Sequence, residues 1–270
     1  MTEQALQIHQ FPCLEDNYGF LVHDPASGYT ACIDTPEVEA IERALEKKGW
    51  TLTHIFNTHH HLDHAGGNLE LKEKTEAVIV GPRKDNSRIP GLDIQLANGD
   101  DYRFAEHEVI ILETPGHTTG HCIYYFAAAG AAFVGDTLFS LGCGRLFEGT
   151  PQEMWTSIQK LMELPDETAV YCAHEYTQAN AKFALSVEPK NKDLVKRAAE
   201  IDKLRAANKP TVPTTIGLER KTNPFMRPDS AELRENVGLV EGRAISPSFG
   251  RTIGLAGPPR TVEIGLKFGY

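Results

Sequence analysis

Asn57-Thr-His-His-His-Leu-Asp-His64 is the densest histidine stretch of this chain, and it stands between a short apolar run and Ala-Gly-Gly. His59 and His61 are two residues apart, so on extended backbone both side chains project to the same side. Imidazole nitrogens with one carboxylate suit Zn²⁺, Fe or Mn, and the lack of a nearby cysteine argues against a purely structural zinc. The internal position and the interleaved Asp63 argue against a chance surface run. The stretch therefore predicts a metal site.

Three more potential ligands stand just past the ends of predicted strands. His117 lies in a Gly/Pro-rich loop after an apolar run, and Asp136 and His174 each follow directly on another such run. Open sheets place their ligands at the carboxyl ends of strands. A single histidine after a strand is more commonly a hydrogen-bonded structural residue, but coincidence does not explain four such segments in one chain. We predict that they form one metal centre.

The order of strand and helix patterns predicts two domains and a tail. Residues 1–176 alternate strand and amphipathic helix patterns, residues 177–238 are mainly helical, and residues 239–270 shift to Gly, Pro and basic residues. The predicted strands are residues 20–23, 30–33, 53–57, 77–81, 109–114, 123–126, 132–135 and 169–173, and the predicted helices include residues 37–48, 69–75, 151–164 and 178–186. The mixed charges of Asn191–Asn208 fit a solvated helix face. This order indicates an α/β sheet domain followed by a smaller helical domain.

Composition narrows the class of protein. The chain has 270 residues, 41% of them hydrophobic, and a net charge of -10, which excludes a disordered chain and argues against a generic binder of nucleic acid or anionic membrane. Its five cysteines form no C-x-x-C pair, so we expect no disulfide framework and a reducing compartment. The chain shows no leader pattern and no apolar run long enough for a bilayer. We expect a cytoplasmic protein without an obligate protein partner.

The motifs resemble those of the metallo-β-lactamase superfamily, and more closely those of the glyoxalase II (hydroxyacylglutathione hydrolase) family. The matching segments are Leu14–Tyr18, Thr58–His64, Thr114–His117, Val134–Phe139, Cys143–Thr150, His174–Thr177 and Asn223–Arg227. The resemblance implies a metallo-β-lactamase-type αββα sandwich with a smaller, mainly helical C-terminal domain. It also implies hydrolysis of S-D-lactoylglutathione and related S-2-hydroxyacylglutathione thioesters to glutathione and D-lactate, a step of methylglyoxal detoxification.

The resemblance assigns the ligands of two divalent metal ions. The first ion takes His59, His61 and His117, and the second takes Asp63, His64 and His174. Asp136 bridges both ions together with a water or hydroxide that serves as the nucleophile, so Asp63 and Asp136 are the catalytic side chains that the resemblance implies. A shared carboxylate and hydroxide offset the repulsion between two neighbouring dications. We expect zinc, with iron and manganese as alternatives, and we expect His60 and His121 to support the ligands.

The resemblance also implies a glutathione site. Arg145 matches the basic position that contacts the glycine carboxylate, and Phe147 stands where the family normally has tyrosine. Tyr176 and Asn180 match further glutathione positions. These four residues are therefore the predicted substrate contacts.

The end of the chain departs from the family. The usual closing Arg-x-x-Lys-Asp segment is absent after Arg227, and Arg260–Tyr270 instead alternates like a strand. The tail from residue 245 on is rich in Gly and Pro, and its three basic residues are Arg251, Arg260 and Lys267. We expect the tail to make no substrate contact, and we expect weaker binding of glutathione with the metal chemistry intact.

Other functions fit the residues of this chain less well. A nucleophilic Cys143 or Cys172 is disfavoured, because Cys172 lies inside an apolar run that predicts an inert core thiol. Within the superfamily, the alternatives are another thioesterase, a lactonase or a mononuclear-iron persulfide dioxygenase, and the full ligand set argues against the last. A nuclease would carry a basic surface or an inserted domain, and a non-enzymatic relative would have lost ligands.

Overall fold

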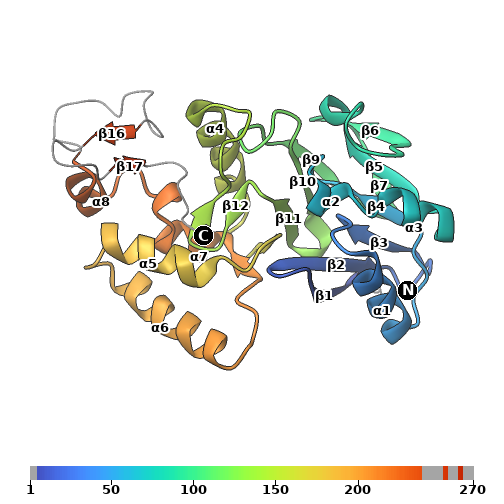
Figure 1. The fold of residues 1–270 in the computed structure, drawn as a ribbon, viewed down its shortest axis with the longest axis horizontal. Helices are drawn as coiled ribbons and strands as arrows, with labels where there is room; N and C mark the ends of the chain where they lie inside the picture. The colour runs from blue at the N-terminus through green and yellow to red at the C-terminus, as the bar shows by residue number, and fades with distance from the viewer. Residues whose placement is uncertain (1–4, 239–251, 255–260, 264–270) are drawn as a thin grey trace. The chain divides into compact units, whose positions relative to one another are not determined.

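The computed structural model describes residues 5–238, 252–254 and 261–263 (Figure 1). The chain forms two compact units. The first unit comprises Met1–Glu113 and Thr119–Gly135, and the second comprises Thr114–Thr118 and Asp136–Tyr270. No helix in the described ranges is both long and apolar enough to cross a bilayer.

A six-stranded sheet forms one layer of the first unit. Its strands, in spatial order, are β1 (Gln7–Cys13), β2 (Asn17–His23), β3 (Thr30–Ile33), β4 (His54–Phe56), β5 (Val78–Pro82) and β6 (Ile94–Leu96). The pairs from β1 to β3 are antiparallel, and the pairs from β3 to β6 are parallel. The predicted strands here are confirmed. The sequence pattern misses β1, because an edge strand tolerates Pro12 and several polar residues.

Three antiparallel strands form the second layer of this unit: β9 (Ile110–Glu113), β10 (Cys122–Phe126) and β11 (Ala131–Gly135). The ring centroids of Phe56 and Tyr124 lie 5.0 Å apart, and those of Phe20 and Phe133 lie 5.6 Å apart. These aromatic contacts join the two layers face to face. Minor elements are β7 (Arg103–Phe104), β8 (His107–Glu108), η1 (Arg83–Asp85) and η2 (Ala127–Ala129).

The described part of the first unit contains the helices α1 (Val38–Lys48), α2 (Leu62–Ala65) and α3 (Asn68–Thr75). The predicted helices at 37–48 and 69–75 are confirmed as α1 and α3. Gly49 ends α1 with φ 67°, a left-handed conformation that glycine adopts without steric cost. The apolar face of α1 packs into one core cluster with residues of β1 to β5. This places a helix layer on the outer face of the six-stranded sheet.

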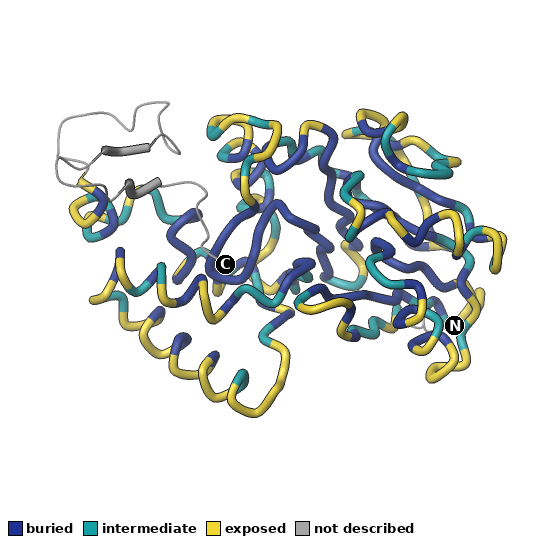
Figure 2. The backbone as a smooth tube through the Cα atoms, in the orientation of Figure 1, coloured by how far each residue is buried: buried dark blue, intermediate teal, exposed yellow. Residues whose placement is uncertain are grey.

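The second unit is mainly helical. Its elements are β12 (Leu138–Phe139), β13 (Gly142–Cys143), α4 (Pro151–Met162), β14 (Ala169–Cys172), α5 (Thr177–Val187), α6 (Lys192–Ala206), β15 (Thr214–Thr215), α7 (Ile216–Thr222), η3 (Pro224–Met226) and α8 (Ala231–Asn236). α4 begins at a capping box formed by Thr150 and Glu153. Figure 2 shows α6 with a buried and an exposed side. The charged run predicted as a solvated face has one exception, because Arg197 is buried.

The tail is described at only two short strands. β16 (Thr252–Gly254) pairs antiparallel with β17 (Thr261–Glu263), which lies within the predicted strand at Arg260–Tyr270. The rest of that predicted strand and the cations Arg251, Arg260 and Lys267 lie outside the described residues. The predicted role of the tail stays a prediction.

Candidate metal centre

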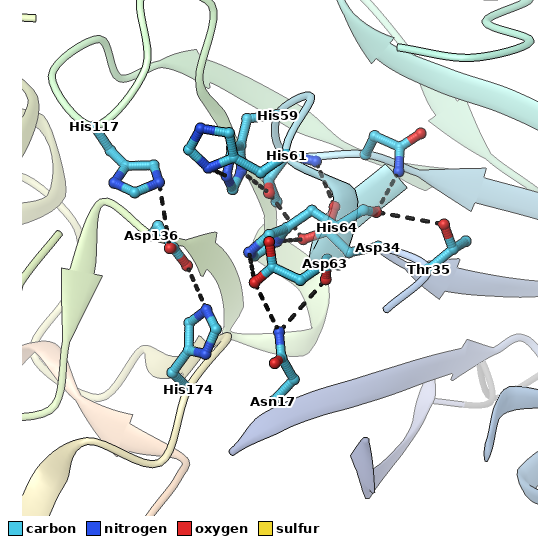
Figure 3. Close-up of polar contacts among 12 residues, drawn as sticks. Asn17, Asp34, Thr35, His59, His61, Asp63, His64, His117, Asp136 and His174 are labelled. Atoms are coloured by element: carbon cyan, nitrogen blue, oxygen red, sulfur yellow. Dashed lines mark hydrogen bonds and ion pairs between the residues drawn. The ribbon is translucent and has the colours of Figure 1, made fainter. Parts of the chain in front are cut away.

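Four predicted ligands gather in the first unit, in the segment from the end of β4 to α2 (Figure 3). The ring centroid of His59 lies 4.6 Å from that of His61 and 4.0 Å from that of His64. Asp63 Oδ2 lies 3.5 Å from His64 Nε2. His59 and His64 are buried, whereas His61 and Asp63 are half-buried. The alternation on extended backbone and the one-turn helix thus bring these side chains together.

Asp34 is hydrogen-bonded to His64 and Thr58 of this segment and was not identified from the sequence. It follows β3, is 5% exposed, and accepts hydrogen bonds from Thr58 N at 2.7 Å, Thr58 Oγ1 at 2.8 Å and His64 Nδ1 at 2.8 Å. Both carboxylate oxygens of Asp34 therefore have hydrogen-bond partners. A signal did exist in the sequence, because Asp34 stands directly past the end of a strand, as Asp136 does.

The hydrogen bonds of Asp34 decide which ring nitrogens carry protons. His64 Nδ1 donates to the carboxylate, so its Nε2 keeps the lone pair. The Thr58 hydroxyl donates to Asp34 and therefore accepts from His59 Nδ1 at 3.0 Å, which leaves His59 Nε2 with its lone pair. Lone pairs on Nε2 are what a cation requires of these two imidazoles.

Asparagine side chains fix the rest of the segment. Asn17 Nδ2 donates to Asp63 Oδ2 at 3.2 Å, and Asn57 Nδ2 donates to the His64 carbonyl at 2.9 Å. Asn68 Nδ2 in turn donates to Asn57 Oδ1 at 2.7 Å. The backbone around Asp63 and His64 is therefore held by side chains as well as by its own helical turn.

The other three predicted ligands form a row in the second unit (Figure 3). His117 Nε2 lies 3.4 Å from Asp136 Oδ2, and His174 Nε2 lies 3.4 Å from Asp136 Oδ1. All three side chains are buried. His117 Nδ1 donates to the Arg145 carbonyl at 2.7 Å, and because a carbonyl only accepts, His117 Nε2 keeps its lone pair. One carboxylate oxygen toward each imidazole suits a carboxylate shared by two cations.

Three of the four predicted substrate residues lie beside this row. The exposed Arg145 places its guanidinium 5.4 Å from the ring centroid of Phe147, and that ring lies 5.2 Å from His117. Tyr176 stacks on His174 with ring centroids 4.8 Å apart. Asn180 differs, because it is buried and donates to the Ser140 carbonyl at 3.0 Å. Its predicted contact with glutathione stays a prediction.

The donor types fit divalent metal ions. Among the described residues, the side chains that belong to groups able to hold a metal ion are His59, His61, Asp63, His64, His117, Asp136 and His174. They are the same residues as the predicted ligand set, and a mixture of imidazole and carboxylate suits zinc, iron or manganese. His60 and His121 are not among them: His60 Nδ1 lies 3.0 Å from the buried Asp85, and His121 stacks on His59. The ligand assignment stays a prediction that this agreement supports.

The cysteines do not offer an alternative nucleophile. All five are free and buried. Burial raises the pKa of the Cys172 thiol to about 12, and burial likewise raises the pKa of Cys143. A thiol must ionise to attack, so both side chains are inert near neutral pH.

Comparison with known proteins places the chain. The family model described as "Metallo-beta-lactamase superfamily" matches residues 30–174, and the family model described as "Hydroxyacylglutathione hydrolase C-terminus" matches residues 175–247. The hydroxyacylglutathione hydrolase of Maricaulis maris (strain MCS10) is 55% identical over 234 residues, which cover 87% of this chain and 91% of that protein. This chain belongs to the hydroxyacylglutathione hydrolase family. The hydroxyacylglutathione hydrolase of Brucella anthropi is 54% identical over 236 residues, covering 87% of this chain and 91% of that protein.

Membership of the hydroxyacylglutathione hydrolase family confirms the predicted family, the predicted α/β metallo-β-lactamase fold and the prediction of a hydrolase. A solved structure agrees with the fold: ETHE1 from Myxococcus xanthus superposes with a TM-score of 0.63 and is 28% identical, covering 87% of this chain and 92% of that one. The superfamily fold implies a dinuclear metal site. The domain boundaries predicted after residues 176 and 238 stay predictions.

Proposed function

We propose that this protein hydrolyses S-2-hydroxyacylglutathione thioesters, S-D-lactoylglutathione among them, to glutathione and D-lactate or the corresponding 2-hydroxy acid. The observation that carries the proposal is the 55% identity over 87% of the chain to a hydroxyacylglutathione hydrolase. The arrangement of metal ligands and a cationic loop side by side in the second unit supports it. The activity would serve the detoxification of methylglyoxal.

Two divalent ions, zinc in the first place, would be held by the predicted ligand set. His59, His61 and His117 would hold one ion, Asp63, His64 and His174 the other, and Asp136 both. When bound, such ions polarise a thioester carbonyl and lower the pKa of a water molecule toward neutrality. The charge of Asp136 would offset the mutual repulsion of two bound cations, and Asp34 and the Arg145 carbonyl would keep the imidazoles of His64 and His117 in the tautomer that metal binding requires.

Arg145 would recognise the glycine carboxylate of glutathione. A guanidinium presents a planar fork of donors that matches a carboxylate, and this one is exposed above the Phe147 ring. Phe147 is 57% exposed and carries no hydroxyl, so it would contribute apolar contact only. Tyr176, stacked on His174, would contribute a further aromatic contact beside the row of His117, Asp136 and His174.

We place the enzyme in the cytoplasm as part of the same proposal. All five cysteines are free thiols, as is usual for proteins of a reducing compartment. Fractionation of the source cells with an antibody against the protein tests this placement.

The activity is tested by following the thioester absorbance of S-D-lactoylglutathione, with metal analysis of the same sample. We expect hydrolysis by protein that contains about two metal ions per chain. A lactone and glutathione persulfide serve as comparison substrates for the two nearest alternative activities. Metal-loaded protein that turns over either of these but not the thioester would contradict the proposal.

A further inference from the structure

A short hairpin connects the shared carboxylate with the substrate loop. Asp136 stands two residues before β12, and Arg145 stands two residues after β13, which pairs with β12. The two ends of the hairpin touch, because Gly144 N donates to the Thr137 carbonyl at 3.3 Å. A Cβ at Gly144 would lie 1.7 Å from the Asp136 carbonyl oxygen, so only glycine fits there. A shift of this hairpin would therefore move both functional residues.

The turn of the hairpin is bonded by side chains of the helical segments. Asn223 Nδ2 donates to the Phe139 carbonyl at 3.2 Å and to the Gly142 carbonyl at 2.9 Å. Glu219 Oε2 accepts from Leu141 N at 2.9 Å. From α5, Asn180 Nδ2 donates to the Ser140 carbonyl at 3.0 Å. Four backbone groups of one turn thus find their partners on α5 and around α7, and each of the three side chains that bind them is almost fully buried.

A buried charge pair completes this set of contacts. Arg197 Nη2 lies 2.6 Å from Glu219 Oε1 and also donates to Ser140 Oγ at 2.8 Å. Glu219 is 0% exposed and Arg197 is 6% exposed. A buried pair adds little net stability over an apolar pair, but it strongly penalises any arrangement that separates its members. Such a pair serves to specify one geometry.

The turn itself needs this support. Leu141 has φ 63°, a left-handed conformation that a residue with a branched side chain rarely adopts. Its side chain is fully buried in a cluster with residues of α5 and α6. Strained backbone of this kind persists only where its surroundings hold it. The helical segments stabilise this conformation in two ways: their side chains form hydrogen bonds with the backbone of the turn, and their apolar residues pack against Leu141.

We propose that Asn180, Glu219 and Asn223, with Arg197, are positioning residues of the enzyme. They hold the hairpin turn so that Asp136 and Arg145 keep the positions that metal and substrate require. The helical part of the chain thereby sets metal affinity as well as substrate affinity. The substrate half of this inference rests on the proposed function, and the metal half does not.

Asn223→Ala and Asn180→Ala test the proposal, because removing Glu219 would leave the buried charge of Arg197 without an opposite charge and could unfold the protein. The matched control is Asn191→Ala: Asn191 also caps a helical segment and donates Nδ2 to a carbonyl, that of Lys221, but bonds no group of the turn. Zinc affinity is measured by competition with a chelator, KM and kcat with S-D-lactoylglutathione at saturating zinc, and Tm by calorimetry.

We expect both test variants to lose about tenfold or more in zinc affinity, the range known for residues that orient metal ligands. KM should rise more than kcat falls, because Arg145 is displaced. The control should lose a similar amount of Tm and keep both zinc affinity and KM. A contact of Asn180 with glutathione alone would change KM without changing zinc affinity.

The proposal is overturned if both variants keep wild-type zinc affinity, or if the control loses as much as they do. Should the wild-type protein fail to hydrolyse the thioester, the proposed function fails, and the zinc measurement still decides the role of the turn.

Discussion

At the scale of single residues, Asp34 orients two of the predicted ligands through hydrogen bonds, His64 directly and His59 through Thr58. We predict that Asp34→Asn lowers the affinity for one metal ion by about ten- to hundredfold. An amide nitrogen facing His64 Nδ1 forces that nitrogen to accept, which moves the ring proton to Nε2 and blocks the ligand position. Metal titration of the apoprotein measures the effect.

The control for this change is Asp24→Asn. Asp24 is also buried and also accepts backbone hydrogen bonds, from Ala26 and Ser27, but it orients none of the predicted ligands. It should lose stability and keep both metal sites. An Asp34→Asn protein that binds two ions as tightly as the wild type would refute the role of Asp34.

Asp136 is the one ligand assigned to both ions. We predict that Asp136→Ala abolishes activity and lowers total metal content, whereas Asp63→Ala and His174→Ala reduce the metal content from about two ions toward one. Metal analysis by mass spectrometry and steady-state kinetics on the same preparations provide the measurement. Near-wild-type turnover by Asp136→Ala with two bound ions would refute the assignment of Asp136 to both ions.

At the scale of elements, β13 carries Cys143 and β14 carries Cys172, and both thiols are buried. A mechanism with a cysteine nucleophile would need an exposed thiol. Because the pKa of Cys172 lies at about 12, this thiol stays protonated at pH 8 and below. We predict that iodoacetamide leaves the native enzyme active and that Cys143→Ala and Cys172→Ala retain wild-type kcat. Alkylation of the unfolded protein, where all five thiols react, is the control. Stoichiometric labelling of one native thiol with loss of activity would revive the cysteine hypothesis.

Arg145, in the loop after β13, has two roles, one for its backbone carbonyl and one for its side chain. The Arg145 carbonyl holds His117, and the Arg145 side chain is proposed to bind the substrate. We predict that Arg145→Ala raises KM for glutathione thioesters about ten- to hundredfold, as expected from a lost charge-assisted contact of about 1.5–3 kcal/mol. The metal content and kcat should change little, because the carbonyl remains and the contact is remote from the reacting bond.

A thioester without the glycine carboxylate serves as the control substrate for Arg145→Ala. Its KM should be the same for the variant and the wild type. Equal losses with both substrates would show that Arg145 acts on the fold of the loop and not on the carboxylate. Arg83→Ala, an exposed arginine paired with Asp100, should alter neither KM.

At the scale of the whole molecule, the proposed ligands are distributed over both compact units. Ions that bind only the folded chain stabilise it, by about 4 kcal/mol at a thousandfold excess over Kd. We predict that chelation lowers Tm by about 10 °C and that zinc restores it. Differential scanning calorimetry measures the shift, and Asp136→Ala should respond much less to the chelator. Identical Tm values for the metal-loaded and metal-free wild type would argue against metal binding at these residues.

The sequence by itself determined the family, the fold class and the candidate ligands, because each of these depends on local features. Because His59 and His61 are two residues apart, extended backbone directs both side chains to the same side. His117, Asp136 and His174 each follow a strand that its β-branched and aromatic residues predict. Comparison with known proteins confirmed the family and the fold. Local periodicity sufficed for these because it reports what each segment forms and which residue types stand at its ends.

Only the tertiary structure decided which groups hold the predicted ligands in place. The hydrogen bond from His64 to Asp34 spans 30 positions, that from His117 to Arg145 spans 28, and that from Asn223 to Phe139 spans 84. No local pattern names such a partner, because it is set by how strands and helices pack. For the same reason, the charged run around Arg197 predicts a solvated face, although packing buries this one cation against Glu219.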